Sequence, residues 1–362
     1  MQRAFFLAVF LLWLPVTSFA APADDVRASM YAVARAQEAY DGGSSKDPGL
    51  TEEIVKLTRL LNGSELDDNN QATARYYRAR AWMLINHLRQ RNRQQADAGL
   101  ARSALADFDW VIARGRDVGP MRVTVANAGY LAGLASQAFL DSPREAYAYW
   151  GKCAQRDHAG CMYLIAAAKV TGEGGMAVDL PGALELHKKV YDTGTAFICA
   201  GAYSALAAAQ IIYFSGATQL TVGDLDWLKR GDLLLEELVK ERKWANPCTR
   251  ARFMMTEYLM RLDRGEDRRG LLESAAKIAE GPEEKATAGF LLGRVSEAEF
   301  LDAARKAGDL ETACDMHFDA YWHAEIRKEG GRAERHYDAL STLAPPNGCA
   351  MERALVKLKY RR

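Results

Sequence analysis

A helical pattern that recurs after 37 residues is the feature that most restricts how this chain can fold. Within residues 146–199, Ala146 and Trp150 of one apolar helical segment are matched by Ala183 and His187 of the next. A repeat of roughly 35–40 residues with two helices per unit is typical of stacked helical-hairpin proteins. We therefore expect an all-α fold, a right-handed α-solenoid of stacked helical hairpins.

Helical periodicity also dominates the rest of the chain, and strand signals are almost absent. Pro143 and Pro282 stand at first-turn positions of expected helices, where the missing N–H group costs nothing. Signals of this kind predict about sixteen helices with short connections and no linker long enough to divide domains. The first four expected helices cover residues 24–40, 51–61, 71–90 and 98–113.

The first twenty residues have the pattern of a signal peptide. Arg3 supplies a positive charge, residues 4–14 form an apolar run, and residues 18–20 end in small residues suited to cleavage near Ala20 and Ala21. An uncleaved membrane anchor is the alternative, but the run is about half of the roughly 20 residues that span a bilayer. We expect a periplasmic or secreted protein with no membrane span after cleavage.

The charge balance argues against a nucleic-acid partner. The chain has 47 Lys and Arg against 47 Asp and Glu. Because phosphate-driven association needs an excess of cations, a generic polyanion binder is not expected.

Six cysteines follow the leader, at positions 153, 161, 199, 248, 314 and 349. An even number in an oxidising compartment indicates disulfides, although unpaired buried cysteines are the alternative. Six cysteines allow fifteen full pairings, among which spacing alone does not choose.

A recognisable motif lies between the two matched segments. Residues 165–175 end in the glycine-rich turn that contains Gly172 and Gly174, and Asp179 precedes the second helical segment. This stretch resembles a Sel1-like repeat, although Lys169 and His187 stand where that family usually has aromatic residues. The remaining hairpins resemble tetratricopeptide (TPR) units. The expected domains are a signal peptide (1–20), N-terminal TPR-like hairpins (21–140), Sel1-like repeats (141–245) and C-terminal TPR-like hairpins (246–362), in one continuous solenoid.

The eight-residue spacing of Cys153 and Cys161 resembles that of secreted cysteine-rich Sel1-like proteins, the Helicobacter cysteine-rich proteins. The resemblance implies a disulfide that joins one hairpin to the next, which should stabilise the fold by about 2–3 kcal/mol. The remaining cysteines are spaced like the first-helix starts of adjacent hairpins. We therefore expect the pairs Cys199–Cys248 and Cys314–Cys349.

Catalytic and metal-binding signals are weak. Ser274 and Lys277 have the Ser-x-x-Lys spacing of penicillin-recognising enzymes, but the other two motifs of those enzymes are absent. The histidines lack paired spacing and the cysteines lack C-x-x-C, so no metal site and no cofactor are expected.

One cationic constellation is a candidate partner-binding surface, because helical-repeat proteins often bind extended peptides in a concave groove. The alternative is a solvated helix face balanced by Asp107 and Asp109. The candidate residues are Arg75, Tyr76, Arg78, Asn86, Arg89, Arg93 and Asn127.

The most favoured function is a non-catalytic, exported scaffold that binds another envelope protein, or a peptide segment of one, in its concave groove. The first alternative is a β-lactam-binding or cell-wall-related hydrolase of the cysteine-rich Sel1-like type. The second is an architectural scaffold that forms homo-oligomers.

Overall fold

The structure, a computed structural model, is all-helical. It describes residues 22–63, 66–114, 125–193, 200–216, 223–242, 250–307, 310–343 and 349–360. Within these ranges the chain forms seventeen α-helices and a short 3-10 helix, with no strand, so the all-α prediction is confirmed. The expected signal peptide at residues 1–20 lies outside the described ranges. The chain divides into two compact units, residues 1–142 and 143–362.

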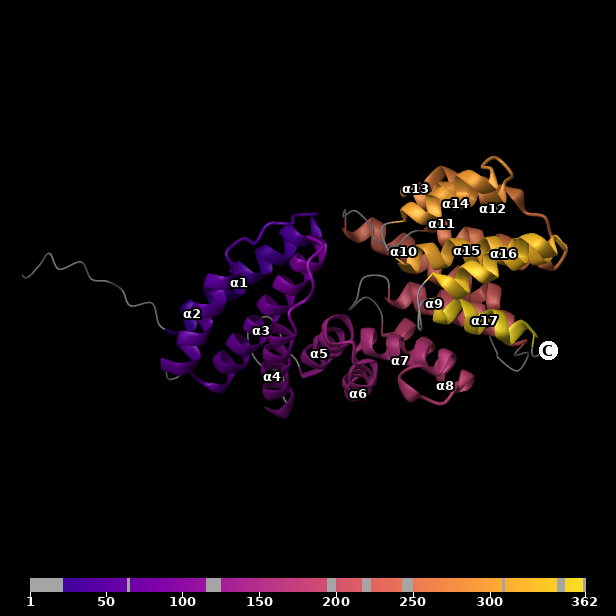
Figure 1. Cartoon of the computed structure of the whole chain (residues 1–362). Helices are drawn as coiled ribbons and strands as arrows, with labels where there is room; N and C mark the ends of the chain where they lie inside the picture. Colours follow the sequence, from indigo (N-terminus) through magenta and orange to yellow (C-terminus); the bar gives the residue numbers. More distant parts are fainter. Residues whose placement is uncertain are drawn as a thin grey trace, which may run out of the picture. The chain divides into compact units, whose positions relative to one another are not determined.

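The first unit is built around one long helix, α3 (Asp68–Arg91), which packs against the other four helices of the unit (Figure 1). Fully buried alanines such as Ala72 and Ala81 let those neighbours approach the α3 backbone closely. The surrounding helices are α1 (Pro22–Asp41), α2 (Leu50–Gly63), α4 (Ala98–Arg114) and α5 (Val125–Leu140).

Side chains hold both ends of α3. Asp67 caps its first turn by accepting a hydrogen bond from the Asn70 backbone N–H at 2.8 Å. Near the other end, the amide of the buried Asn86 exchanges two hydrogen bonds with the backbone of Asp97, at 2.7 and 2.9 Å. Asn86 therefore fixes the connection that leads into α4.

The second unit contains the other twelve α-helices, most of which pack against their neighbours in sequence. They are α6 (Pro143–Ala154), α7 (Ala159–Thr171), α8 (Leu180–Asp192), α9 (Ala200–Ser215), α10 (Asp224–Arg242), α11 (Arg250–Asp263), α12 (Arg269–Ile278), α13 (Pro282–Leu291), α14 (Glu297–Lys306), α15 (Leu310–Ile326), α16 (Gly330–Thr342) and α17 (Ala350–Tyr360), with the 3-10 helix η2 (Glu173–Gly175) after α7.

The turn between α7 and α8 follows from local chemistry. Gly172 ends α7 in the left-handed region, at φ 81°, which a residue without Cβ adopts at little cost. Asp179 then caps α8 by accepting from the Gly182 backbone N–H at 2.9 Å, and it also pairs with Lys169 at 2.6 Å. Lys169 therefore closes the turn by an ion pair.

The last helix returns to the first helices of the second unit. α17 packs against α7 and α9, which lie about 150 to 190 positions earlier in the chain, and Figure 1 shows it beside α9. The neighbouring helix α15 lies deep in the core, where Trp322 and Phe318 contact Phe214 of α9, with ring centroids 4.7 and 5.5 Å apart. These contacts tie the end of the unit to its beginning.

Two pairs of cysteines lie at disulfide distance, and both pairings are among those expected. The Cα atoms of Cys153 and Cys161 are 5.9 Å apart, and those of Cys314 and Cys349 are 5.2 Å apart. The first pair joins the end of α6 to the start of α7, and the second joins α15 to the residue before α17. The expected pair of Cys199 and Cys248 lies outside the described residues.

No helix in the described ranges combines the length and the apolar character needed to cross a bilayer.

Candidate binding site

The strongest candidate site begins with carboxylates on α15. Glu311, Asp315 and Asp319 follow one another at intervals of four residues, so they share one face of that helix. Asp319 has no exposed side-chain surface, whereas Asp315 keeps 29% of its side chain exposed. The face therefore runs from solvent into the interior of the second unit.

A single arginine meets these carboxylates. Arg252 on α11 donates to Asp315 at 2.5 Å, and its Nη1 lies 3.7 Å from Oδ2 of Asp319. Neither carboxylate oxygen of Asp319 accepts a hydrogen bond from the described residues. Asp319 is thus a fully buried acid whose hydrogen-bonding capacity is unused.

Glu352 of α17 completes the group, which we call the acidic cluster: Arg252, Asp315, Asp319 and Glu352. Burial raises the pKa of all three carboxyl groups, and the Arg252 guanidinium only partly opposes that rise. For Arg252, burial acts against the charge, but the carboxylates outweigh it and raise its pKa. Three carboxyl groups therefore share one positive charge, and the site favours either protons or another cation.

The pKa values of two nearby tyrosines are affected by these charged groups. Burial raises the pKa of Tyr163 on α7, and Glu311 and Asp315 raise it further. Burial likewise raises the pKa of Tyr203 on α9, although Arg252 lowers it in part. Both phenols therefore stay neutral near neutral pH, and helices α7, α9, α11, α15 and α17 all contribute to the surroundings of the cluster.

The carboxylates of the acidic cluster do not form a compact metal cage. Among the described residues, the one group of three or more metal-binding donors that lie within 4.8 Å of one another is Cys153, His158 and Cys161. The three carboxyl groups of the acidic cluster therefore do not all lie within that distance of one another.

A cleft of 560 Å³ lies between α17 and the turn after α7. Its lining includes Arg353 and Lys357 of α17 and Glu173 of η2. This volume is within the range of ligand-binding pockets. Since Arg353 follows Glu352 directly, α17 contributes to the acidic cluster and to this cleft.

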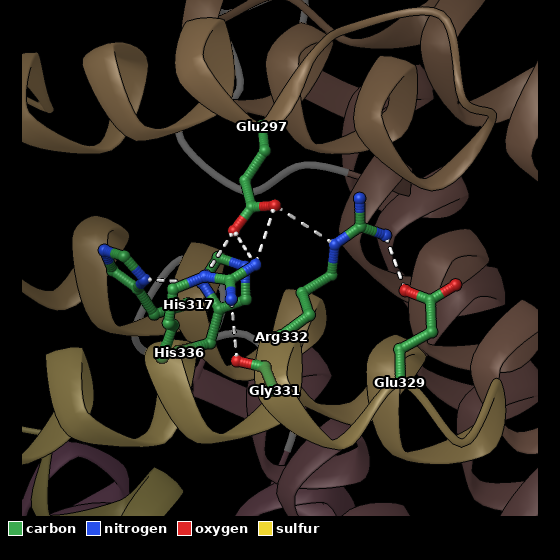
Figure 2. Close-up of polar contacts among 7 residues, drawn as sticks. Glu297, His317, Glu329, Gly331, Arg332 and His336 are labelled. Carbon is green, nitrogen blue, oxygen red and sulfur yellow. Dashed lines mark hydrogen bonds and ion pairs between the residues drawn. The ribbon is translucent and has the colours of Figure 1, made fainter.

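A second polar cluster joins α14, α15 and α16, but its charges are balanced (Figure 2). Arg332 and Arg335 of α16 donate to the carboxylate of Glu297, with their shortest contacts at 3.3 and 2.9 Å, and Arg332 also donates to Glu329 at 2.7 Å. Burial opposes the charge on Glu297, but the two arginines outweigh it and lower its pKa. Two carboxylates thus meet two guanidinium groups.

Two histidines beside this cluster pair with each other. The Nδ1 atoms of His317 and His336 are 3.0 Å apart, and Figure 2 shows the two rings close to each other near Glu297. Burial lowers the pKa of both imidazoles, that of His336 to about 4, so the pair is neutral near pH 7 with one ring as donor and one as acceptor. We interpret this cluster as a structural junction between helices.

The residues predicted to bind a partner do not form one cationic face. Arg75 and Arg78 both donate to the buried Asp107 of α4, at 3.0 Å and at 2.7 and 2.8 Å. Asp107 is 29 and 32 residues away in sequence, and this pairing agrees with the part of the alternative in which Asp107 balances these cations. Arg75 and Arg78 are therefore engaged inside the first unit.

The other members of that surface lie in different environments. Tyr76 is buried against Tyr77 and Phe108, and Asn86 is buried in its contact with Asp97. The remaining members are Arg89, which donates to the Gln95 carbonyl, Arg93, which is exposed in the turn after α3, and Asn127, which is half-buried on α5. Partner binding by the exposed members stays a prediction.

Ser274 and Lys277 are both exposed on α12. No hydrogen bond joins their side chains in the part of the chain that the structure describes. An activated serine needs a base within hydrogen-bond reach and donors for the developing oxyanion, and no such contacts are described around Ser274.

Sequence reasoning did not identify the acidic cluster, although one signal was present. Carboxylates at 311, 315 and 319 recur every fourth residue on a helix whose other positions are mostly apolar or aromatic. Such a charged stripe on a core helix requires buried partners. The partners themselves, Arg252 and Glu352, are too distant in sequence to be assigned without the fold.

A scan against models of known protein families and a search of curated proteins both found no match.

Proposed function

We propose that this chain is a non-catalytic, exported binding module of the stacked-hairpin type, whose second unit recognises a cationic side chain of a partner peptide. The observation that carries the proposal is the acidic cluster, in which three carboxyl groups face one guanidinium. A lysine or arginine side chain would supply the missing positive charge and would give Asp319 a hydrogen-bond donor.

The acidic cluster is open to solvent at one end and buried at the other, which supports a peptide side chain as the ligand. Asp315 is partly exposed, while Arg252 and Asp319 lie successively deeper, so an extended side chain can enter from solvent. The 560 Å³ cleft beside α17 offers room for the flanking residues of the same peptide. Lys357, which is exposed at this cleft, favours an acidic neighbour in that peptide.

The exported location and the superhelical arrangement are part of the same proposal. Two cysteine pairs at disulfide distance suit an oxidising compartment. Packing between successive helices suits a Sel1-like or TPR-like right-handed solenoid that would bind an envelope protein.

The test is a binding titration with fluorescent peptides that contain one lysine, one arginine or one citrulline in an otherwise neutral background. We expect the lysine and arginine peptides to bind, and the Asp315→Asn and Glu352→Gln variants to lose at least tenfold in affinity. The matched control is Asp302→Asn, because Asp302 pairs with Lys306 on the exposed surface of α14. Equal binding of the citrulline peptide, or unchanged affinity in Asp315→Asn, would contradict the proposal.

A second candidate is a cell-wall-directed hydrolase. The observation that favours it is the mutual proximity of Asp315 and Glu352, both with raised pKa values, since a protonated carboxyl beside a second carboxyl can act as a general acid. Release of soluble fragments from purified peptidoglycan, lost in Glu352→Gln, would establish this activity in place of simple binding.

A further inference from the structure

Three side chains with metal-binding donor atoms meet at the junction of α6 and α7. Cys153 lies in the last turn of α6, His158 is the N-cap of α7, and Cys161 lies in the first turn of α7. The two sulfur atoms and one ring nitrogen of His158 lie within 4.8 Å of one another, and all three residues are buried. The spacing is C-x4-H-x2-C, and the turn between α6 and α7 places the imidazole near both cysteines.

Contacts other than the disulfide hold this junction. Asp157, at φ 59°, reverses the chain direction directly before His158, and its carboxylate pairs with Lys189 of α8 at 2.5 Å. Met162 and Val190 pack together in a small apolar cluster beside it. The arrangement of the three donors therefore does not depend on the disulfide alone.

The geometry suits a thiophilic cation once the two sulfur atoms are separate thiols. Zinc binds thiolate sulfur at about 2.3 Å and imidazole nitrogen at about 2.0–2.1 Å, so ligand atoms on one ion lie about 3.3–3.8 Å apart. The 5.9 Å between the two Cα atoms is compatible with that separation. Nδ1 of His158 accepts a hydrogen bond from the Cys161 backbone N–H at 3.3 Å, so its lone pair already points at the first turn of α7.

We propose that, after reduction of the disulfide, Cys153, His158 and Cys161 bind one thiophilic d10 cation of the zinc or copper(I) class. Nδ1 of His158 is the nitrogen ligand, and its bond to the metal replaces the hydrogen bond to the Cys161 amide. This inference is independent of the proposed function, because it concerns a different part of the second unit.

The chemistry balances with a phosphine as reductant. The phosphine breaks the S–S bond and is oxidised to the phosphine oxide by taking the oxygen of one water, whose two hydrogens end on the two sulfur atoms. Binding of Zn²⁺ then forms two Zn–S bonds and releases both thiol protons to solvent.

The second cysteine pair is an internal control. Cys314 and Cys349 also lie at disulfide distance, but no His, Asp or Glu of the described residues completes a three-donor group with them. Reduction yields two thiols at each cysteine pair, but of these two pairs only Cys153 and Cys161 also have an imidazole, that of His158, beside them.

The experiment uses the full chain, reduced anaerobically with a phosphine and titrated with Co²⁺ and then Zn²⁺. We expect thiolate-to-cobalt charge-transfer absorption at one equivalent, displaced by Zn²⁺ and absent from the oxidised protein. Cys153→Ser should abolish the band, and His158→Asn, which keeps an N-cap side chain, should weaken affinity at least tenfold. Cys314→Ser and Cys199→Ser should leave the band unchanged.

Alkylation followed by mass spectrometry identifies the ligands independently of the variants. Zn²⁺ should protect Cys153 and Cys161 of the reduced chain from iodoacetamide and leave Cys314 and Cys349 reactive, with folding followed by circular dichroism. If reduction unfolds the chain, Zn²⁺ should restore its helicity together with this protection. Absence of protection at Cys153 and Cys161, or a cobalt band that survives Cys153→Ser, would overturn the proposal.

Discussion

Loss of Asp107 should destabilise the first unit far more than loss of any exposed acid. The side chain of Asp107 is only 3% exposed and accepts hydrogen bonds from Arg75 and Arg78, whose side chains are 27% and 13% exposed. In Asp107→Ala both guanidinium groups keep their charge at positions where water can solvate them only in part.

The magnitude follows from that burial. Breaking a fully buried ion pair by removing one partner costs about 3–5 kcal/mol, and the partial exposure of both arginines reduces this to about 3 kcal/mol. The matched control is Asp24→Ala, because the pair of Asp24 and Arg27 is more than half exposed. That variant should change the free energy of unfolding by about 0.5 kcal/mol or less.

Urea unfolding gives the stability change, and amide hydrogen exchange followed by mass spectrometry assigns it to α3 and α4. We expect faster exchange in these two helices of Asp107→Ala, with helices α6 to α17 unaffected. A loss below about 1 kcal/mol would contradict a structural role for the buried Asp107, because it would mean that Arg75 and Arg78 are solvated well enough to serve as a free cationic surface.

Three further outcomes are expected. In Gly174→Ala, at φ 64°, the added Cβ would overlap the ring of Tyr147, so thermal unfolding should show a loss of stability of about 2–4 kcal/mol. The control is Gly175→Ala, which has open space at its Cβ position and should lose only about 1 kcal/mol. Burial lowers the pKa of His187 to about 3, so below about pH 6.5 the unfolded chain takes up a proton that the folded chain does not. The free energy of unfolding should therefore decrease as the pH is lowered, by about 2 kcal/mol at about pH 5 relative to neutral pH. The H187Q variant should show a flatter dependence of stability on pH. A fluorescent penicillin should not label the exposed Ser274, and covalent labelling there, lost in Ser274→Ala, would refute the non-catalytic proposal.

Local chemistry in the sequence was sufficient to predict the turn between α7 and α8. Gly172 takes the left-handed conformation that ends a helix, and Asp179 caps the next helix, as their residue types indicate. Pro143 and Pro282 open α6 and α13, where the N–H that proline lacks has no partner within the helix. Such features depend on a few consecutive residues, so the sequence alone carries them.

The charged sites are formed by residues that are distant in the sequence, so a pattern of neighbouring residues does not predict them. The sequence alone is compatible both with a partner surface on α3 and with a helix face balanced by Asp107 and Asp109, and only the packing of α4 against α3 shows that Asp107 pairs with Arg75 and Arg78. The acidic cluster combines residues of α11, α15 and α17, which come together because α11 and α17 both pack against α15. Long-range packing therefore decides which charges are paired and which are left in excess.

The most direct test of the acidic cluster as a cation site is the number of protons released on binding. Because burial keeps the pKa values of Asp315 and Glu352 raised, a bound lysine side chain must lower those values and expel protons. Titration calorimetry of the lysine peptide in buffers of different ionisation enthalpy measures this number. We expect net proton release in mildly acidic solution, and less release in Asp315→Asn. Binding with no proton release, or with proton uptake, would contradict a cation site at the acidic cluster.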